Sequence, residues 1–147
     1  MKIAIVGAEE RKWNGYNIKD VKIQIAEILN KNKDTVLVSG HCPFGGVDIW
    51  AEDYTYEHKI KSEIYRPTNN RWTPNGYKER NIRIAESCDE IYVFSPADEN
   101  GKPLWNGGIW TANYAQALGK KSHFINILKK ELKYEEIFGN ENKEVKL

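Results

Sequence analysis

Short apolar runs alternate with segments of helical periodicity along most of the chain. The runs are rich in β-branched and aromatic residues, which is typical of strands. Between them, apolar residues recur every three or four positions, which is typical of helices that bury one face. The expected strands are 2–6, 35–38, 62–66, 90–95 and 122–127, and the expected helices are 18–29, a helix from 47, 77–88 and 109–118. This alternation predicts an α/β fold in which helices cover both faces of an open parallel sheet.

Bulk properties limit the classes of partner. The 147 residues are enough for one domain, expected at 1–128, followed by a charged tail at 129–147 with a short helix at 130–138. Lys and Arg number 22 against 21 Asp and Glu, so the near-neutral charge disfavours nucleic acid as a partner. No apolar run approaches the roughly 20 residues of a membrane span, and the apolar start is too short for a signal peptide. We therefore expect a cytoplasmic protein that does not bind membranes.

The two cysteines do not indicate a metal site. Cys42 and Cys88 are far apart in the sequence, and no cluster of histidines accompanies them. We predict no metal and no cofactor. Cys88 lies in an apolar helical pattern and is expected in the core. Cys42 would need a base to act as a nucleophile, and His41 is its neighbour in sequence only.

The stretch 35–52 carries the clearest local signal for a ligand. A buried strand ends at Ser39-Gly40, and Gly45-Gly46 precedes a helix from residue 47. The first N–H groups of a helix lack internal partners, and the helix dipole favours an anion there. The alternative is that the glycines only permit a tight turn, because the spacing matches no standard phosphate loop. Asp48 suits a helix start, whereas Glu52 is a candidate to face a ligand hydroxyl or an arginine.

Other candidate residues follow the carboxyl ends of the strands, where open parallel sheets bind ligands. These loops span 7–17, 39–46, 67–76 and 95–108. They hold three tryptophans, which could stack on a base or wall off a pocket, or could pack at a loop rim or an oligomer interface: Trp13, Trp72 and Trp105. Asn81 lies on the otherwise apolar face of the expected helix 77–88, and Arg80 flanks it. The Asn81 amide therefore needs a partner, either loop backbone or a ligand.

Three stretches together resemble the SLOG superfamily of Rossmann-like domains, which includes the LOG-type phosphoribohydrolases and the core of DNA-processing protein A. Residues 2–7 are similar to its opening strand and glycine. Residues 38–52 are similar to its SGG…GGVD…AE segment. Arg80-Asn81 precedes the strand 89–94 as in its RN…D segment, and the turn at 107–112 resembles its second glycine pair. The resemblance covers roughly residues 1–127.

The resemblance implies a Rossmann-like three-layer sandwich with a five-stranded parallel sheet of order 3-2-1-4-5. It also implies a nucleotide or nucleotide-derived ligand. By position in the motifs, the implied ligand contacts are Gly7, Ser39, Gly40, Gly45, Gly46, Arg80, Gly107, Gly108 and Thr111. Asp48 and Asn81 complete the expected site.

The sequence departs from the enzymes of the family at one point. The phosphoribohydrolases place a carboxylate after the second glycine pair, but residues 112–116 contain none. Residues 113–120 also loosely match the nucleoside 2-deoxyribosyltransferases, whose nucleophilic glutamate falls at Thr111. Cleavage of an N-glycosidic bond needs a carboxylate at the oxocarbenium-like centre.

We therefore expect a binding module, either a nucleotide sensor or a sequestering domain. The alternative is an N-glycosidic hydrolase or transferase on nucleoside monophosphates that uses a carboxylate from elsewhere. Its catalytic candidates are Glu52 and Asp48, and further carboxylates are Glu9, Glu10 and Asp98. Binding of single-stranded DNA, as in DNA-processing protein A, is disfavoured by the near-zero net charge. Five tryptophans in so small a domain also suggest a homo-oligomer.

Overall fold

The computed structural model describes residues 1–69, 71–72, 76–104 and 107–129. Within them, one parallel sheet has the strand order β3-β2-β1-β4-β5, so the predicted fold class is confirmed. The strands are β1 (Lys2–Gly7), β2 (Val36–Ser39), β3 (Lys61–Ile64), β4 (Glu90–Ala97) and β5 (Lys121–Leu128). The α-helices are α1 (Ile18–Asn30), α2 (Val47–Glu57), α3 (Tyr77–Ser87) and α4 (Gly107–Ala117).

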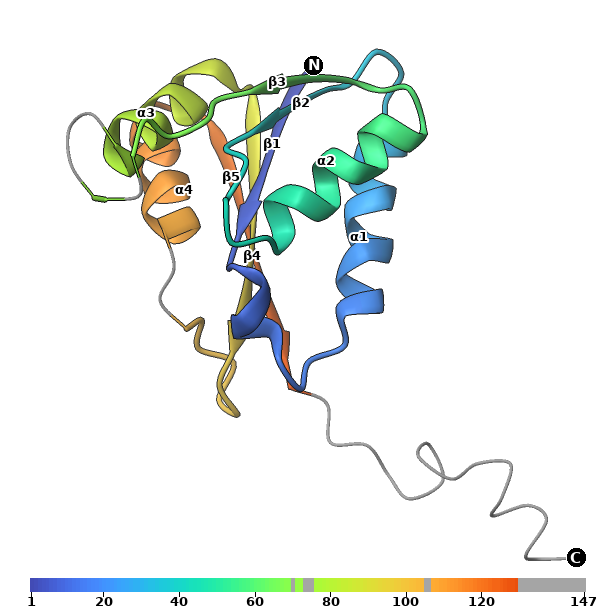
Figure 1. Cartoon of the computed structure of the whole chain (residues 1–147), viewed down its shortest axis with the longest axis vertical. Helices are drawn as coiled ribbons and strands as arrows, with labels where there is room; N and C mark the ends of the chain where they lie inside the picture. The colour runs from blue at the N-terminus through green and yellow to red at the C-terminus, as the bar shows by residue number, and fades with distance from the viewer. Residues whose placement is uncertain (70, 73–75, 105–106, 130–147) are drawn as a thin grey trace, which may run out of the picture.

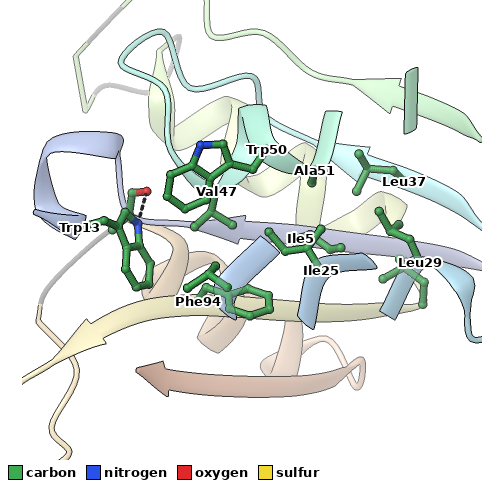
Figure 2. Packing of buried hydrophobic residues seen from close by; sticks show 12 residues of the cluster. Ile5, Trp13, Ile25, Leu29, Leu37, Val47, Trp50, Ala51 and Phe94 are labelled. Atoms are coloured by element: carbon green, nitrogen blue, oxygen red, sulfur yellow. Dashed lines mark hydrogen bonds between the residues drawn. The ribbon is translucent and has the colours of Figure 1, made fainter. Parts of the chain in front are cut away.

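The helices cover the sheet in pairs, which gives the predicted three layers (Figure 1). Helices α1 and α2 cover one face, and α3 and α4 cover the other. The central strand β1 alternates between the two cores. Ile5 packs with Val47 and Phe94 in the first core (Figure 2), whereas Ala4 and Val6 belong to the second. This two-sided burial explains why β1 reads as a continuous apolar run.

Most predicted boundaries agree with the structure to within two residues. The side chain of Asn17 caps the start of α1, because it accepts a hydrogen bond from the Asp20 N–H. Two differences matter for the site. Helix α4 begins at Gly107, so the second glycine pair forms its first turn instead of preceding it. The expected loop 7–17 contains a 3₁₀ helix, Glu10–Trp13. The predicted helix 130–138 and most of the tail lie outside the described residues.

Trp13 belongs to the core and does not line a ligand pocket. Its side chain is fully buried against Trp50 and Tyr16, and its indole N–H donates to the Ala8 carbonyl at 3.0 Å (Figure 2). Packing was one of the two expected roles for this residue. The hydrogen bond fixes the chain just after β1, so Trp13 holds in place the segment that forms one wall of the site.

No helix in the described part of the chain combines the length and the apolar character that a membrane span requires. The cytoplasmic location remains a prediction.

Candidate functional site

A cavity of about 280 Å³ lies beyond the carboxyl end of β1. In a sheet of this order, the connections from β1 and from β4 leave toward opposite sides, which makes the crevice between these strands the expected ligand position. Seven of the predicted site residues line the cavity: Gly7, Asp48, Arg80, Asn81, Gly107, Gly108 and Thr111. Ser39, Gly40, Gly45 and Gly46 do not line it.

Gly7 is required by close packing where β1 enters the cavity wall. A Cβ atom at this position would lie 2.5 Å from the Phe94 carbonyl oxygen and 2.7 Å from Cγ2 of Val47. No side chain fits there without displacing β4 or α2. The glycine therefore lets the start of α2 approach the end of β1, which brings Asp48 to the cavity.

The first turn of α4 opens into the cavity through Gly107 and Gly108. The hydroxyl of Thr111 donates to the Gly107 carbonyl at 2.9 Å, within the same helix. A Cβ at Gly107 would touch only Nδ2 of Asn81, at 3.6 Å, among the described residues. The space in front of this helix start is therefore open, and the helix dipole favours an anion in it.

Arg80 places a buried positive charge in the same cavity. The residue is 7% exposed. Its Nη1 donates to the Gly40 carbonyl, and its Nε donates to Oδ1 of Asn81 at 2.7 Å. In the described part of the chain, Arg80 forms no ion pair within 4.0 Å. A guanidinium carries five N–H donors, and a buried charge is normally paired, so this group is suited to an anionic ligand.

Asn81 finds its partner in a neighbouring side chain. The amide is 5% exposed, and its oxygen accepts from Arg80 as described above. The sequence-based alternatives were loop backbone or a ligand, and Arg80 was not among them. Because the oxygen is used by Arg80, the amide group turns its Nδ2 toward the start of α4.

Asp48 is the acidic counterpart of Arg80 in the cavity. It is 5% exposed, and Oδ2 accepts the Cys42 N–H at 3.1 Å. Its Oδ1 is buried without a hydrogen-bond partner among the described residues. Burial raises the pKa of Asp48 to about 6, although the positive charge of Arg80 opposes this shift. This carboxyl group therefore changes its charge close to neutral pH.

Cys42 lines the cavity as a neutral thiol. Burial raises its pKa above the ordinary value, which disfavours the reactive thiolate. The neighbouring imidazole of His41 contacts Glu52 instead. These contacts give no support to a nucleophilic role for Cys42.

Glu52 lies outside the cavity and holds the turn after β2. Its carboxylate accepts the Ser39 hydroxyl at 2.8 Å and lies 2.7 Å from Nδ1 of His41. Among the described residues its partners are therefore Ser39 and His41 and not an arginine, which was one of the two partners considered from the sequence. A Cβ on Gly40 would lie 2.7 Å from Cζ of Arg80, so the glycine makes room for the guanidinium. Gly40 therefore positions Arg80 without lining the cavity itself, and Ser39 binds Glu52.

The first glycine pair closes a tight turn, which is the second of the two interpretations of this segment. Gly45 and Gly46 have φ angles of 78° and 90°. A Cβ on Gly46 would overlap the Ala8 carbonyl and lie 2.7 Å from the Glu10 nitrogen. The Val47 N–H, at the start of α2, donates to that same Ala8 carbonyl at 3.3 Å. Packing against the segment after β1 thus accounts for Gly46, and the positive φ angle accounts for Gly45.

Aromatic side chains that the sequence did not single out complete the walls. Phe44 and Tyr77 line the cavity together with the predicted Trp72. Trp72 also contacts Trp110 edge-to-face, with ring centroids 4.9 Å apart, and Trp110 stacks on Tyr114 with ring centroids 5.3 Å apart. In the sequence, only their positions in a loop or at a helix start indicate that Phe44 and Tyr77 could reach a ligand. Trp105 lies outside the described residues, and the homo-oligomer stays a prediction.

The described residues contain no group of three or more His, Cys, Asp or Glu side chains arranged to hold a metal ion. Comparisons with protein-family models, with curated proteins and with solved structures found no match to this chain. The resemblance to the SLOG superfamily therefore rests on the sequence motifs alone and stays a prediction.

Proposed function

We propose that the protein binds a nucleotide or a nucleotide-derived small molecule in this cavity, as a sensor or a sequestering module. The observation that carries the proposal is the buried guanidinium of Arg80, which lines the cavity without an ion-pair partner in the described part of the chain. A phosphate supplies the opposite charge, and arginine binds it with two parallel hydrogen bonds. The first turn of α4 favours the same group.

The remaining walls favour a ligand larger than a free anion. Trp72, Tyr77 and Phe44 offer flat apolar surfaces on which a base can stack. Asp48 offers a carboxyl group that can accept a hydrogen bond from a sugar hydroxyl. Phosphate, sugar and base together describe a nucleotide, which agrees with the ligand that the SLOG resemblance implies.

The proposal is tested by thermal-shift and calorimetric titration with nucleoside monophosphates, ADP-ribose forms and cyclic nucleotides. Free nucleosides and inorganic phosphate separate the two halves of the ligand. A ligand at 100 times its dissociation constant stabilises the folded protein by about 2.7 kcal/mol. If no member of the panel shifts the unfolding temperature, the proposal fails.

A matched pair of variants on α3 tests the role of Arg80. Arg80→Gln removes the charge from the cavity, and we expect roughly 10- to 100-fold weaker binding of AMP, because hydrogen bonds to charged groups contribute about 1.5–3 kcal/mol. Arg83→Gln removes a charge from the exposed side of the same helix, where Arg83 lies 3.6 Å from Glu79. Equal loss of affinity in the two variants would contradict the assignment. Thermal unfolding of each variant confirms that it is folded.

A second candidate function, cleavage of an N-glycosidic bond, is favoured by Asp48. Of the five carboxylates considered from the sequence, only Asp48 and Glu9 line the cavity. Glu9 is paired with Arg11 at 2.6 Å, whereas one oxygen of Asp48 lacks a partner among the described residues. A carboxyl pKa of about 6 suits acid–base chemistry near neutral pH.

Base release from AMP, measured at high protein concentration, tests this second function. If the protein is such an enzyme, Asp48→Asn abolishes release and Glu9→Gln leaves most of it. Release that survives in Asp48→Asn would remove Asp48 from this role. Tight binding of AMP without any release would leave the binding function alone.

A further inference from the structure

Asp48 and Arg80 bring opposite charges to one cavity without forming a close ion pair. Both residues line the cavity and both are more than nine-tenths buried. Arg80 is absent from the ion pairs within 4.0 Å in the described ranges. The two charges are still close enough to interact, because the Arg80 guanidinium acts to lower the pKa of Asp48. Each charge is thus partly balanced by the other across the cavity.

An anion bound to Arg80 changes the charge around Asp48. The anion adds a negative charge near Asp48 in a region of low dielectric constant, and like charges disfavour the ionised form of a carboxyl group. Besides Arg80, the backbone N–H groups of Cys42, at 3.1 Å from Oδ2, and of Gly7 favour the ionised form of Asp48, but burial outweighs them. Oδ1 has no hydrogen-bond partner among the described residues.

We propose that Asp48 makes anion binding proton-linked: an anion enters the Arg80 site together with one proton, which the Asp48 carboxylate takes from solvent. An O–H bond forms on Asp48, and the proton cancels one unit of the added negative charge. This inference rests on the proposed function and deepens it, since it names how the same site is regulated. Affinity for an anionic ligand falls as the pH rises.

The other titratable groups around Asp48 do not offer an equivalent proton site. Glu52, one turn along α2, is hydrogen-bonded to Ser39 and His41. Across the cavity, Glu9 is paired with Arg11, and Lys12 contributes a further positive charge. Two more groups stay neutral near pH 7, because burial raises the pKa values of Cys42 and Tyr77. The imidazole of His41 contacts Glu52 at 2.7 Å, and a substitution tests its part separately.

The burial of Asp48 sets the size of the effect. With a pKa of about 6, the group is mostly ionised at about pH 7.5. Above its pKa, the apparent affinity for an anion that does not itself titrate falls roughly tenfold per pH unit. At about pH 7.5 the affinity is then roughly 30-fold below its limit at low pH.

Calorimetric titration with sulfate and with cyclic AMP tests the proposal, because neither probe titrates between about pH 5 and pH 8. Each titration is run in two buffers that differ in ionisation enthalpy, which yields the number of protons taken up. We expect close to one proton per bound anion at about pH 7.5 and close to none at about pH 5. In Asp48→Asn, we expect no uptake and roughly 30-fold tighter binding at the higher pH.

Two control variants separate Asp48 from its neighbours. Asp53→Asn makes the same change on the exposed side of α2 and should leave both affinity and uptake unchanged. His41→Asn removes the histidine, and asparagine tolerates the φ of 51° found there. Uptake that persists in Asp48→Asn, or that disappears in His41→Asn, overturns the proposal.

The wild-type protein alone also decides the matter if Asp48→Asn does not fold. Sulfate or cyclic AMP that binds at about pH 7.5 without proton uptake overturns the proton linkage and leaves the binding function intact. If neither these probes nor any nucleotide of the thermal-shift panel binds at either pH, the proposed function itself fails.

Discussion

Gly107→Ala should separate ligand binding from stability. Gly107 lies in the first turn of α4 and lines the cavity. A Cβ there would make one ordinary contact, 3.6 Å from Nδ2 of Asn81, and its φ is not in the left-handed region. Alanine loses less chain entropy than glycine on forming a helix, so we expect the free energy of unfolding to rise by about 0.5 kcal/mol.

The same methyl group should block the anion. It projects into the space in front of the helix start, where a phosphate would accept hydrogen bonds from backbone N–H groups. Hydrogen bonds to a charged group contribute about 1.5–3 kcal/mol, so the affinity for AMP should fall on the order of 10- to 100-fold. Urea unfolding measures the first effect, and calorimetric titration with AMP measures the second.

Gly119→Ala is the matched control at the other end of α4. Gly119 has a φ of 86°, and no atom of the described residues comes within 4 Å of an added Cβ, so alanine strains the backbone without a steric clash with them. We expect a loss of about 1 kcal/mol in stability and unchanged affinity for AMP. If Gly107→Ala binds AMP as tightly as the wild type, no anion lies at the start of α4, and that part of the site is wrong.

Three further variants test the remaining structural assignments. Gly46→Ala should lower the free energy of unfolding in urea by more than about 2 kcal/mol, because φ is 90° and the Cβ overlaps the Ala8 carbonyl; a loss under 1 kcal/mol would contradict the tight turn. Trp13→Phe should cost about 2 kcal/mol through the lost hydrogen bond to Ala8 and the smaller buried ring, and near-wild-type stability would contradict this role. The folded-state pKa of Asp48 lies above its unfolded value of 3.8, so its contribution to stability is present below about pH 4 and lost as the pH rises through 6. At about pH 7.5, the free energy of unfolding of Asp48→Asn should therefore exceed that of the wild type by up to about 3 kcal/mol, and below about pH 4 the two should match. A difference in stability that does not change with pH would contradict the assignment.

The fold was predictable because its signals are local and repeated. The apolar run of β1 reflects burial on both faces, and the 3.6-residue periodicity of α1 follows from packing one face against the sheet. Neither pattern contains the order of the strands. That order came from the resemblance of short motifs, such as Gly7 and Arg80-Asn81, to a known superfamily, and the sheet confirms it.

The site was only partly predictable, as the two glycine pairs demonstrate. Gly45-Gly46 and Gly107-Gly108 look alike in the sequence, since each lies at a helix start. The distant segment around Ala8 distinguishes them among the described residues: it fills the space next to Gly46, whereas an added Cβ on Gly107 would meet only Nδ2 of Asn81. Contacts between residues so far apart in the chain leave no local pattern.

The chemistry of Asp48 and Thr111 depends on the same kind of long-range contact. Thr111 aligns with the nucleophilic glutamate of the nucleoside 2-deoxyribosyltransferases, and the structure shows its hydroxyl bound to its own helix. A carboxyl group nevertheless lines the cavity, contributed by α2. The pKa of Asp48 is raised by burial, which depends on residues far from it in the sequence. The cavity therefore contains an acid although no carboxylate follows the second glycine pair. Proton uptake on Asp48 when an anion binds would indicate a role in binding, whereas loss of base release in Asp48→Asn would indicate a role in catalysis.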